Sequence, residues 1–149
     1  MDTHSVPLDS RFREVYDLLA PGRIAGLDSL YAPNIRFTDP FHDIEGLPAL
    51  ESYFESMYRN VVVCTFAWGP SGSSGDGSIL FQEWTMTLRH RTFRPRETVH
   101  IPGCSRLTVE HDLIVAHRDH FDAAALIHDR LPVLGAILRR VRASVGASR

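Results

Sequence analysis

Apolar residues recur at helical spacing near the start of the chain. Positions i, i+3, i+4 and i+7 are apolar there, which predicts a helix whose buried stripe is Phe12, Val15, Tyr16 and Leu19. Asp9 or Ser10 is available to cap the first turn, and Pro21 marks the end of the helix. The chain is therefore expected to open with a helix that faces a core.

Two further helices are predicted before the main run of strands. Helical spacing continues over residues 24–31 and predicts a second, short helix that ends before Pro33, because a residue that precedes proline disfavours the helical conformation. A third helix is predicted to begin near Pro48. Its apolar side is formed by Leu47, Leu50, Phe54 and Met57.

Other stretches alternate in the way that strands do. In residues 34–39, Ile35, Phe37 and Asp39 share one face, so Asp39 is in phase with the apolar side. Later stretches rich in β-branched and aromatic residues predict an antiparallel meander over residues 61–68, 78–91, 97–109 and 113–121. The Gly- and Ser-rich residues 69–78 are expected to form a flexible hairpin loop, and they lack the Gly-Lys-Ser/Thr ending of a phosphate-binding loop.

The C-terminal part of the chain returns to helical signals. Asp122 is placed to cap a short helical turn, and Pro132 opens a predicted final helix with the apolar side Leu134, Ile137, Leu138 and Val141. We expect one domain over residues 1–149, with a flexible N-terminus at 1–8 and a C-terminal helical extension at 123–149. The final helix is expected to pack over the sheet or the pocket mouth, or to help form a dimer, rather than to lie on a membrane.

Composition and charge exclude several classes of function. The net charge of -2 provides no positive field to gather nucleic acid. All 16 basic residues are Arg, which excludes lysine-dependent Schiff-base chemistry. The chain opens without a basic and apolar leader and contains no apolar run long enough to span a membrane, so it is expected to be cytoplasmic.

Cysteine and histidine spacing gives no metal site. Cys64 and Cys104 are the only cysteines, and we interpret both as small buried apolar residues rather than redox groups. His117 and His120 are three residues apart on a predicted strand, so they point to opposite faces and cannot share a metal ion. No sequence motif of an organic cofactor appears, and no cofactor is predicted.

The order helix, helix, strand ending in Asp-Pro, helix and long meander resembles the nuclear transport factor 2 superfamily. Within it, residues 30–58 are similar to the stretch of SnoaL-like and ketosteroid-isomerase-like proteins in which a strand delivers Asp to a pocket and Pro follows. The resemblance implies an α+β fold in which a cone-shaped, curved, mixed or antiparallel sheet is wrapped by N-terminal helices around an apolar pocket. Because that fold hosts both enzymes and non-enzymes, it does not settle the function.

The resemblance to ketosteroid isomerases assigns roles to two residues. Asp39, in the Asp-Pro pair, matches the general base, and Tyr16, on the first helix, matches the Tyr that donates to the developing enolate. The third position of that template, a protonated Asp, falls near Gly103 or Cys104, where no carboxylic acid is present. The oxyanion site implied by the resemblance is therefore incomplete.

Residues 117–122 resemble a second template, the Trp-Arg-Asp-Tyr-Phe-Asp motif of limonene-epoxide-hydrolase-like enzymes. The resemblance places Asp119 at the acid position. Its partner motif is absent, because Trp84 and Met86 stand where Arg and Asp are required. Epoxide hydrolysis is therefore the less favoured activity.

Each candidate residue has a structural alternative. Asp39 could serve only to organise a turn by accepting backbone N–H groups of the next helix. His117 and Asp119 share a strand face and suit a proton relay, but they could equally form a satisfied polar pair. Tyr16 could be a core tyrosine bonded to backbone. The side chains expected to contact a ligand are Phe37, Phe54, Trp84, Met86, Cys104 and Phe121.

These patterns favour a pocket protein of the SnoaL-like or ketosteroid-isomerase-like kind. The leading hypothesis is an isomerase- or cyclase-type enzyme that acts on a small apolar carbonyl compound, with Asp39 as base and with Tyr16, His117 and Asp119 as donors or relay. The alternative is a non-catalytic module that binds a small ligand or a partner. A homodimer formed through the outer face of the sheet is also expected.

Overall fold

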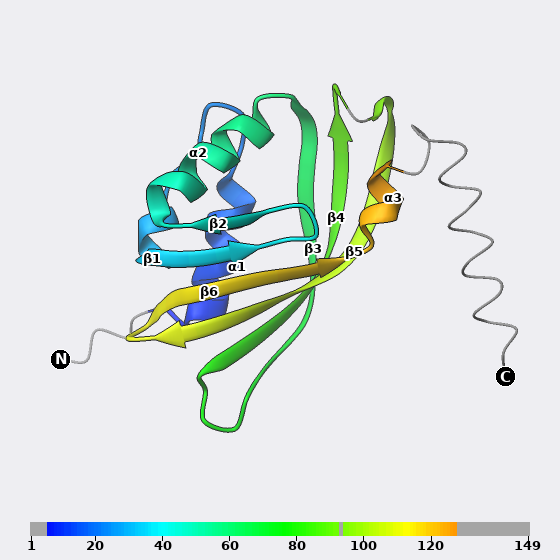
Figure 1. The fold of residues 1–149 in the computed structure, drawn as a ribbon. Coiled ribbons are helices and arrows are strands. Elements are labelled where there is room, and N and C mark those ends of the chain that lie inside the picture. The colour runs from blue at the N-terminus through cyan, green and yellow to red at the C-terminus, as the bar shows by residue number, and fades with distance from the viewer. Residues whose placement is uncertain (1–5, 93, 128–149) are drawn as a thin grey trace, which may run out of the picture.

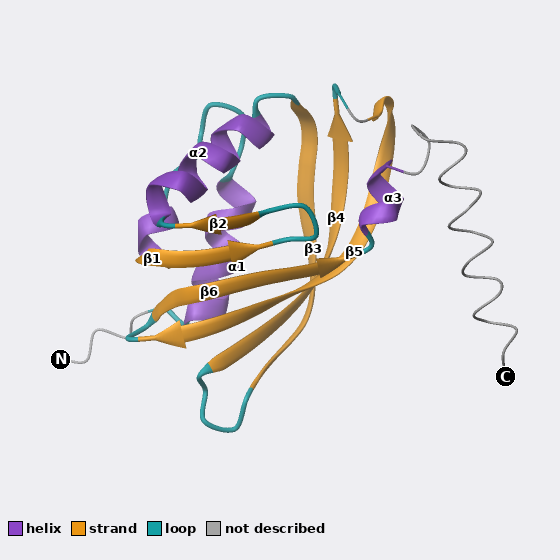
Figure 2. Ribbon diagram, viewed as in Figure 1, coloured by secondary structure: helices purple, strands orange, loops and turns teal. Residues whose placement is uncertain are grey.

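A six-stranded mixed sheet forms the body of the protein (Figures 1 and 2). The computed structural model describes residues 6–92 and 94–127. Its strands are β1 (Tyr31–Thr38), β2 (Asp43–Glu45), β3 (Val61–Ser73), β4 (Ile79–His90), β5 (Arg94–Glu110) and β6 (Leu113–Phe121). They lie in the order β2-β1-β6-β5-β4-β3. β1 and β6 are parallel, and all other neighbours are antiparallel.

Two helices line the inner side of this curved, open sheet. α1 (Leu8–Leu18) packs against β3, and α2 (Leu47–Tyr58) packs against β1 and β2. The short helices η1 (Leu27–Ser29) and α3 (Ala123–Ile127) complete the described chain. The predicted α+β, cone-shaped fold with a wrapped sheet is thus confirmed (Figure 1).

The first predicted helix is present, but it is capped differently. α1 begins at Leu8 with Pro7 at its N-cap, so neither Asp9 nor Ser10 caps it. Asp9 instead lies in the first turn and pairs with Arg13 at 2.9 Å. The predicted stripe faces inward, and its buried members are Phe12, Tyr16 and Leu19.

The prediction of a second helix over residues 24–31 is wrong. Only the single 3-10 turn η1 forms there, and Tyr31 already belongs to β1. Gly26, just before this turn, adopts a φ of 82°, a left-handed conformation that interrupts a helix. One turn suffices to bury both Leu27 and Leu30, so the i, i+3 spacing did not require a helix.

The chain also contains more strand than the sequence indicates. Residues Gly69–Ser73, predicted as loop, continue β3 and pair with β4. The remaining turn is organised by Asp76, which accepts hydrogen bonds from Ser74 Oγ at 2.7 Å and Ser78 Oγ at 2.8 Å. The hydrogen bond from the Ser78 backbone N–H is the main cause that lowers the pKa of Asp76 to about 2, and the two hydroxyl bonds add to it. The edge strand β2 was not predicted, because its three residues are mostly charged.

The termini were predicted in part. Leu8 lies in α1, so the predicted flexible segment 1–8 extends too far, and residues 1–5 lie outside the described residues. Oδ1 of Asp122 accepts the Ala124 N–H at 3.0 Å at the start of α3, as predicted. The predicted final helix, from Pro132, lies outside the described residues. No helix within the described ranges is long and apolar enough to cross a membrane.

The core lies between the helices and the concave face of the sheet. It includes the fully buried side chains Phe12, Leu27, Leu30, Tyr31, Ile35, Leu50, Tyr58, Leu107 and Ile114. On the outer face, Phe81 of β4 is 42% exposed. The homodimer expected through that face remains a prediction.

Candidate functional site

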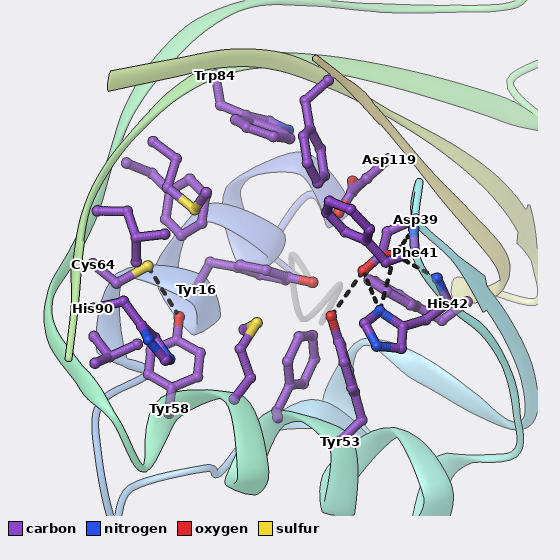
Figure 3. Close-up of a pocket in the computed structure, with 18 of the residues that line it drawn as sticks. Tyr16, Asp39, Phe41, His42, Tyr53, Tyr58, Cys64, Trp84, His90 and Asp119 are labelled. Atoms are coloured by element: carbon purple, nitrogen blue, oxygen red, sulfur yellow. Dashed lines mark hydrogen bonds and ion pairs between the residues drawn. The ribbon is translucent and has the colours of Figure 1, made fainter. Parts of the chain in front are cut away.

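An apolar cavity of about 650 Å³ lies inside the cone, between the sheet and the helices (Figure 3). Its wall is formed by residues of α1, α2 and of every strand except β2, together with the turn after β1. The aromatic side chains in this wall are Phe12, Tyr16, Phe37, Phe41, Tyr53, Phe54, Tyr58, Phe66, Trp68, Trp84 and Phe121. Two aspartates, Asp39 and Asp119, also line it.

Asp119 of β6 is fixed through one of its two carboxylate oxygens. The Ser105 hydroxyl donates to Oδ1 at 2.6 Å, and Nε2 of His117 lies 2.6 Å from the same atom. Oδ2 takes part in no hydrogen bond within the described part of the chain. Because Asp119 lines the cavity, this arrangement leaves one oriented carboxylate oxygen for a ligand (Figure 3).

His117 lies behind the wall and connects Asp119 to two tyrosines. Its side chain is 0% exposed. Nδ1 lies 2.8 Å from the Tyr31 hydroxyl, which lies 2.8 Å from the Tyr16 hydroxyl. A neutral His117 that donates from Nε2 to the carboxylate must accept from Tyr31 at Nδ1. Tyr16 then donates to Tyr31, and the Tyr16 oxygen keeps lone pairs available on the cavity side.

The tyrosines of this chain remain neutral at ordinary pH. Burial is the main cause that raises the pKa of Tyr16 and of Tyr31 well above the ordinary value of 10.0.

Trp84 extends the hydrogen bonding on the other side of the Asp119 carboxylate. Its Nε1 donates to Ser105 Oγ at 2.9 Å. A continuous series of hydrogen bonds therefore orients Asp119 from both directions.

Asp39 lines the cavity but has most of its lone pairs occupied. Its side chain is 6% exposed. Oδ1 accepts the backbone N–H groups of Phe41 at 2.7 Å and His42 at 2.8 Å, and Oδ2 accepts the Tyr53 hydroxyl at 2.8 Å. Asp39 thus faces the cavity and also organises a turn. The backbone N–H donors belong to residues 41 and 42, and the helix α2 contributes only the Tyr53 hydroxyl.

A second polar group lies at the opposite end of the cavity (Figure 3). The Tyr58 hydroxyl lies 3.7 Å from Cys64 Sγ, and His90 lines the wall nearby. Burial is the main cause that raises the pKa of both Tyr58 and the Cys64 thiol. Tyr58 and Cys64 are therefore both neutral at ordinary pH, and the hydrogen bond between them is weak.

Five of the six residues expected to contact a ligand lie in the wall, namely Phe37, Phe54, Trp84, Met86 and Phe121. Cys104 is the exception. It pairs across the sheet with Glu83 and His120, on the outer face, because alternation along β5 turns Ser105 inward instead. Ser105 is 1% exposed.

Three residues of the site were not found from the sequence. Ser105 lies two positions from Gly103 on the inward phase of β5, and that phase is the signal that could have identified it. Tyr53 lies three residues after Leu50 on α2, at the edge of the predicted stripe. Tyr31 was assigned to a helix that does not form. No three His, Cys, Asp or Glu side chains are grouped to hold a metal ion among the described residues.

Replacing Gly103 with Ala should disturb the cavity wall. A Cβ at Gly103 would lie within 2.6 Å of ring carbons of Trp84, so the indole must move away from its Ser105 bond. We expect a loss of about 1–3 kcal/mol in the free energy of unfolding, measured by urea denaturation. Gly72→Ala in β3 is the control, because nothing lies within 4 Å of its Cβ. Equal stability of the two variants would contradict this packing.

A protein-family model described as a SnoaL-like domain matches residues 12–117 of the chain. No curated protein sequence matches it. Solved structures are similar in fold at low sequence identity. A hypothetical protein with a ketosteroid isomerase-like fold from Catenulispora acidiphila, in complex with trimethylamine, is 9% identical, with a TM-score of 0.67 over 80% of this chain and 88% of that one.

Two other solved structures carry names of enzymes. A candidate SnoaL-like polyketide cyclase from Jannaschia sp. CCS1 is 11% identical, with a TM-score of 0.66 over 85% of this chain and 96% of that one. An LEH-like epoxide hydrolase from M. tuberculosis is 17% identical, with a TM-score of 0.65 over 89% and 93%. At these identities the likeness concerns the fold alone.

Proposed function

The chain belongs to the SnoaL-like domain family, and from this premise we propose that it is an acid–base enzyme that acts on a small, largely apolar carbonyl compound. The proposed reaction begins with removal of a proton from the carbon next to the carbonyl group. Isomerisation or ring closure then follows from the resulting enolate. Relatives in fold that are named as cyclases support this class of reaction.

The observation that carries the proposal is the state of Asp119. One of its oxygens is held by Ser105 and His117, and the other is open to an apolar cavity. A carboxylate fixed in this way is pre-positioned to accept a proton from a bound ligand. The surrounding apolar wall excludes water, which would otherwise compete for the carboxylate.

In the proposed first step, Oδ2 of Asp119 takes the proton and the C–H electron pair moves into the new C=C bond. The carbonyl π electrons move to oxygen, giving the enolate. The Tyr16 hydroxyl turns from Tyr31 to donate a hydrogen bond to that oxygen. Return of the proton from Asp119 to a different carbon completes an isomerisation. Alternatively, the enolate carbon attacks a second carbonyl of the same molecule and closes a ring. The π electrons of that carbonyl move to its oxygen, and the resulting alkoxide takes the proton back from Asp119.

This proposal moves the role of base from Asp39 to Asp119. Asp39 matches the base by resemblance, but its oxygens accept from two backbone N–H groups and from Tyr53. Those donors occupy lone pairs of both oxygens and restrict the access of the carboxylate to a substrate proton. We therefore assign Asp39 to the positioning of Tyr53 and of the cavity rim.

The competing function is binding without chemistry. It is favoured by one observation: the inward positions of β5 hold Gly103 and Ser105, so this strand supplies no second carboxylic acid to assist the enolate oxygen. Epoxide hydrolysis is less favoured, because Trp84 and Met86, which replace the required Arg and Asp, line the cavity as apolar side chains.

Exchange of hydrogen for deuterium distinguishes these functions. Steroid, polyketide and terpenoid ketones would be incubated with the protein in D₂O, and loss of α-proton signal followed by NMR. We expect at least one ketone to exchange faster than with heat-denatured protein. Ketones that bind, as seen by quenching of tryptophan fluorescence, but never exchange would establish the binding function instead.

A further inference from the structure

The cavity wall is rich in negative charge and poor in positive charge. The chain has 16 Arg, yet none is found among the described residues that line the cavity. Asp39 and Asp119 both line it, and in the described wall only His42 and His90 can become positively charged. An anionic ligand would therefore meet two carboxylates and no permanent cation.

The polar atoms of the wall that remain available are mainly acceptors. Oδ2 of Asp119 makes no hydrogen bond within the described residues, while Oδ1 is fully engaged. Whenever the Tyr16 hydroxyl donates to Tyr31, the Tyr16 oxygen also presents lone pairs to the cavity. A ligand that donates hydrogen bonds or carries positive charge satisfies these groups, and an anionic carboxylate does not.

The aromatic wall adds to this preference. The chain contains 8 Phe, 4 Tyr and 2 Trp, and the eleven named above line this one cavity. The faces of aromatic rings are negative, so they attract cations, and most strongly where water is excluded. Near Asp119, the Trp84 and Phe121 rings lie 6.1 Å apart between centroids. Rings and carboxylate together form a site suited to an organic ammonium group.

We propose that the cavity selects cationic substrates, namely apolar carbonyl compounds that carry a protonated or quaternary amine. This inference rests on the proposed function and names the class of its substrate. It also addresses the missing second acid: no Arg or Lys is found in the described wall, and Asp119 is already engaged as the base. An ammonium group within the substrate supplies the positive charge that stabilises the enolate oxygen.

Three probes with the same skeleton separate charge from shape: N,N-dimethylbenzylamine, phenylacetone and phenylacetate, which at neutral pH are a cation, a neutral ketone and an anion. Both tryptophans of the chain, Trp68 and Trp84, line the cavity, so fluorescence quenching reports its occupancy. We expect the amine to bind at least about tenfold more tightly than the ketone, and phenylacetate to bind most weakly.

The source of the preference is tested with Asp119→Asn, which keeps an acceptor for Ser105 and His117 but removes the charge. Amine binding should weaken by about tenfold or more in this variant, while phenylacetone binding changes by less than about threefold. Glu83→Gln is the matched control, because it removes a carboxylate from the outer face of β4. It should leave all three affinities unchanged. Circular dichroism verifies that each variant is folded.

The outcomes separate this inference from the proposed function. Phenylacetone or phenylacetate binding as tightly as the amine, or no amine binding at all, overturns the cation preference even if ketones exchange their α-protons. Amine preference that persists in Asp119→Asn also overturns it, because the charge of Asp119 would then play no part. If the protein prefers the amine but exchanges the α-protons of no ketone, the inference about the ligand is supported and the proposed enzymatic function is overturned.

Discussion

Asp119→Asn should slow ketone α-proton exchange by about 10²–10⁴-fold, whereas Asp39→Asn should slow it by less than about tenfold. The first variant removes the only wall carboxylate that has an oxygen without a hydrogen bond among the described residues. An amide cannot accept the proton at neutral pH. The second variant removes a carboxylate whose oxygens already accept from backbone N–H groups and from Tyr53.

The Asp119→Asn and Asp39→Asn variants are compared on kcat as well as on kcat/KM. A base is required only in the chemical step, so Asp119→Asn should lower kcat, whereas a change in the cavity rim should act mainly on KM. Asn retains an Oδ1 that can accept from Ser105 and His117, and unchanged circular dichroism would verify that the wall is intact. A larger loss in Asp39→Asn than in Asp119→Asn would return the role of base to Asp39.

Strand alternation explains what could be predicted of this site. Ile35 and Phe37 of β1 are 0% and 2% exposed, so the phase that placed Asp39 toward the interior was correct. In β6 the same rule placed His117 and Asp119 on one face, and the structure joins them by a hydrogen bond. Period-two patterns in strands buried on one face fix side-chain direction without knowledge of the partners.

Strand alternation did not identify site residues whose position depends on pairing with another strand. The phase of β5 indicates that Ser105 rather than Cys104 is inward, but only the register between β5 and β6 shows that Ser105 meets Asp119. Tyr31 was missed for a related reason: its spacing fits a helix, and only its pairing with Ile114 of β6 shows that it begins a strand. The partner of Tyr31 lies more than eighty positions away along the chain, beyond the reach of a local pattern.

Alkaline pH should unfold the protein rather than titrate its tyrosines in the native state. All four tyrosines of the chain, Tyr16, Tyr31, Tyr53 and Tyr58, have a pKa raised chiefly by burial. In the unfolded chain each ionises near its ordinary pKa of about 10. Above that pH the unfolded state binds fewer protons than the native state, so the free energy of unfolding falls as pH rises.

The free energy of unfolding should fall steeply with rising pH. Four groups that ionise only on unfolding remove up to about 5 kcal/mol of stability per pH unit once the pH is well above 10, since each contributes about 1.4 kcal/mol. A domain whose free energy of unfolding is about 5–15 kcal/mol should therefore unfold within a few pH units above 10. Tyrosinate absorbance and far-ultraviolet circular dichroism should therefore change together in a single transition.

The alkaline titration also tests directly whether the four tyrosines are buried, because buried tyrosines must lose their protons together when the protein unfolds. Tyr53→Phe removes one ionising group and should move the alkaline transition to higher pH, unless the lost bond to Asp39 costs more stability than the ionisation did. Stability measured at neutral pH separates these two effects. In concentrated urea the same tyrosines should titrate near pH 10. A tyrosinate signal near that pH with native circular dichroism would show that at least one hydroxyl reaches solvent.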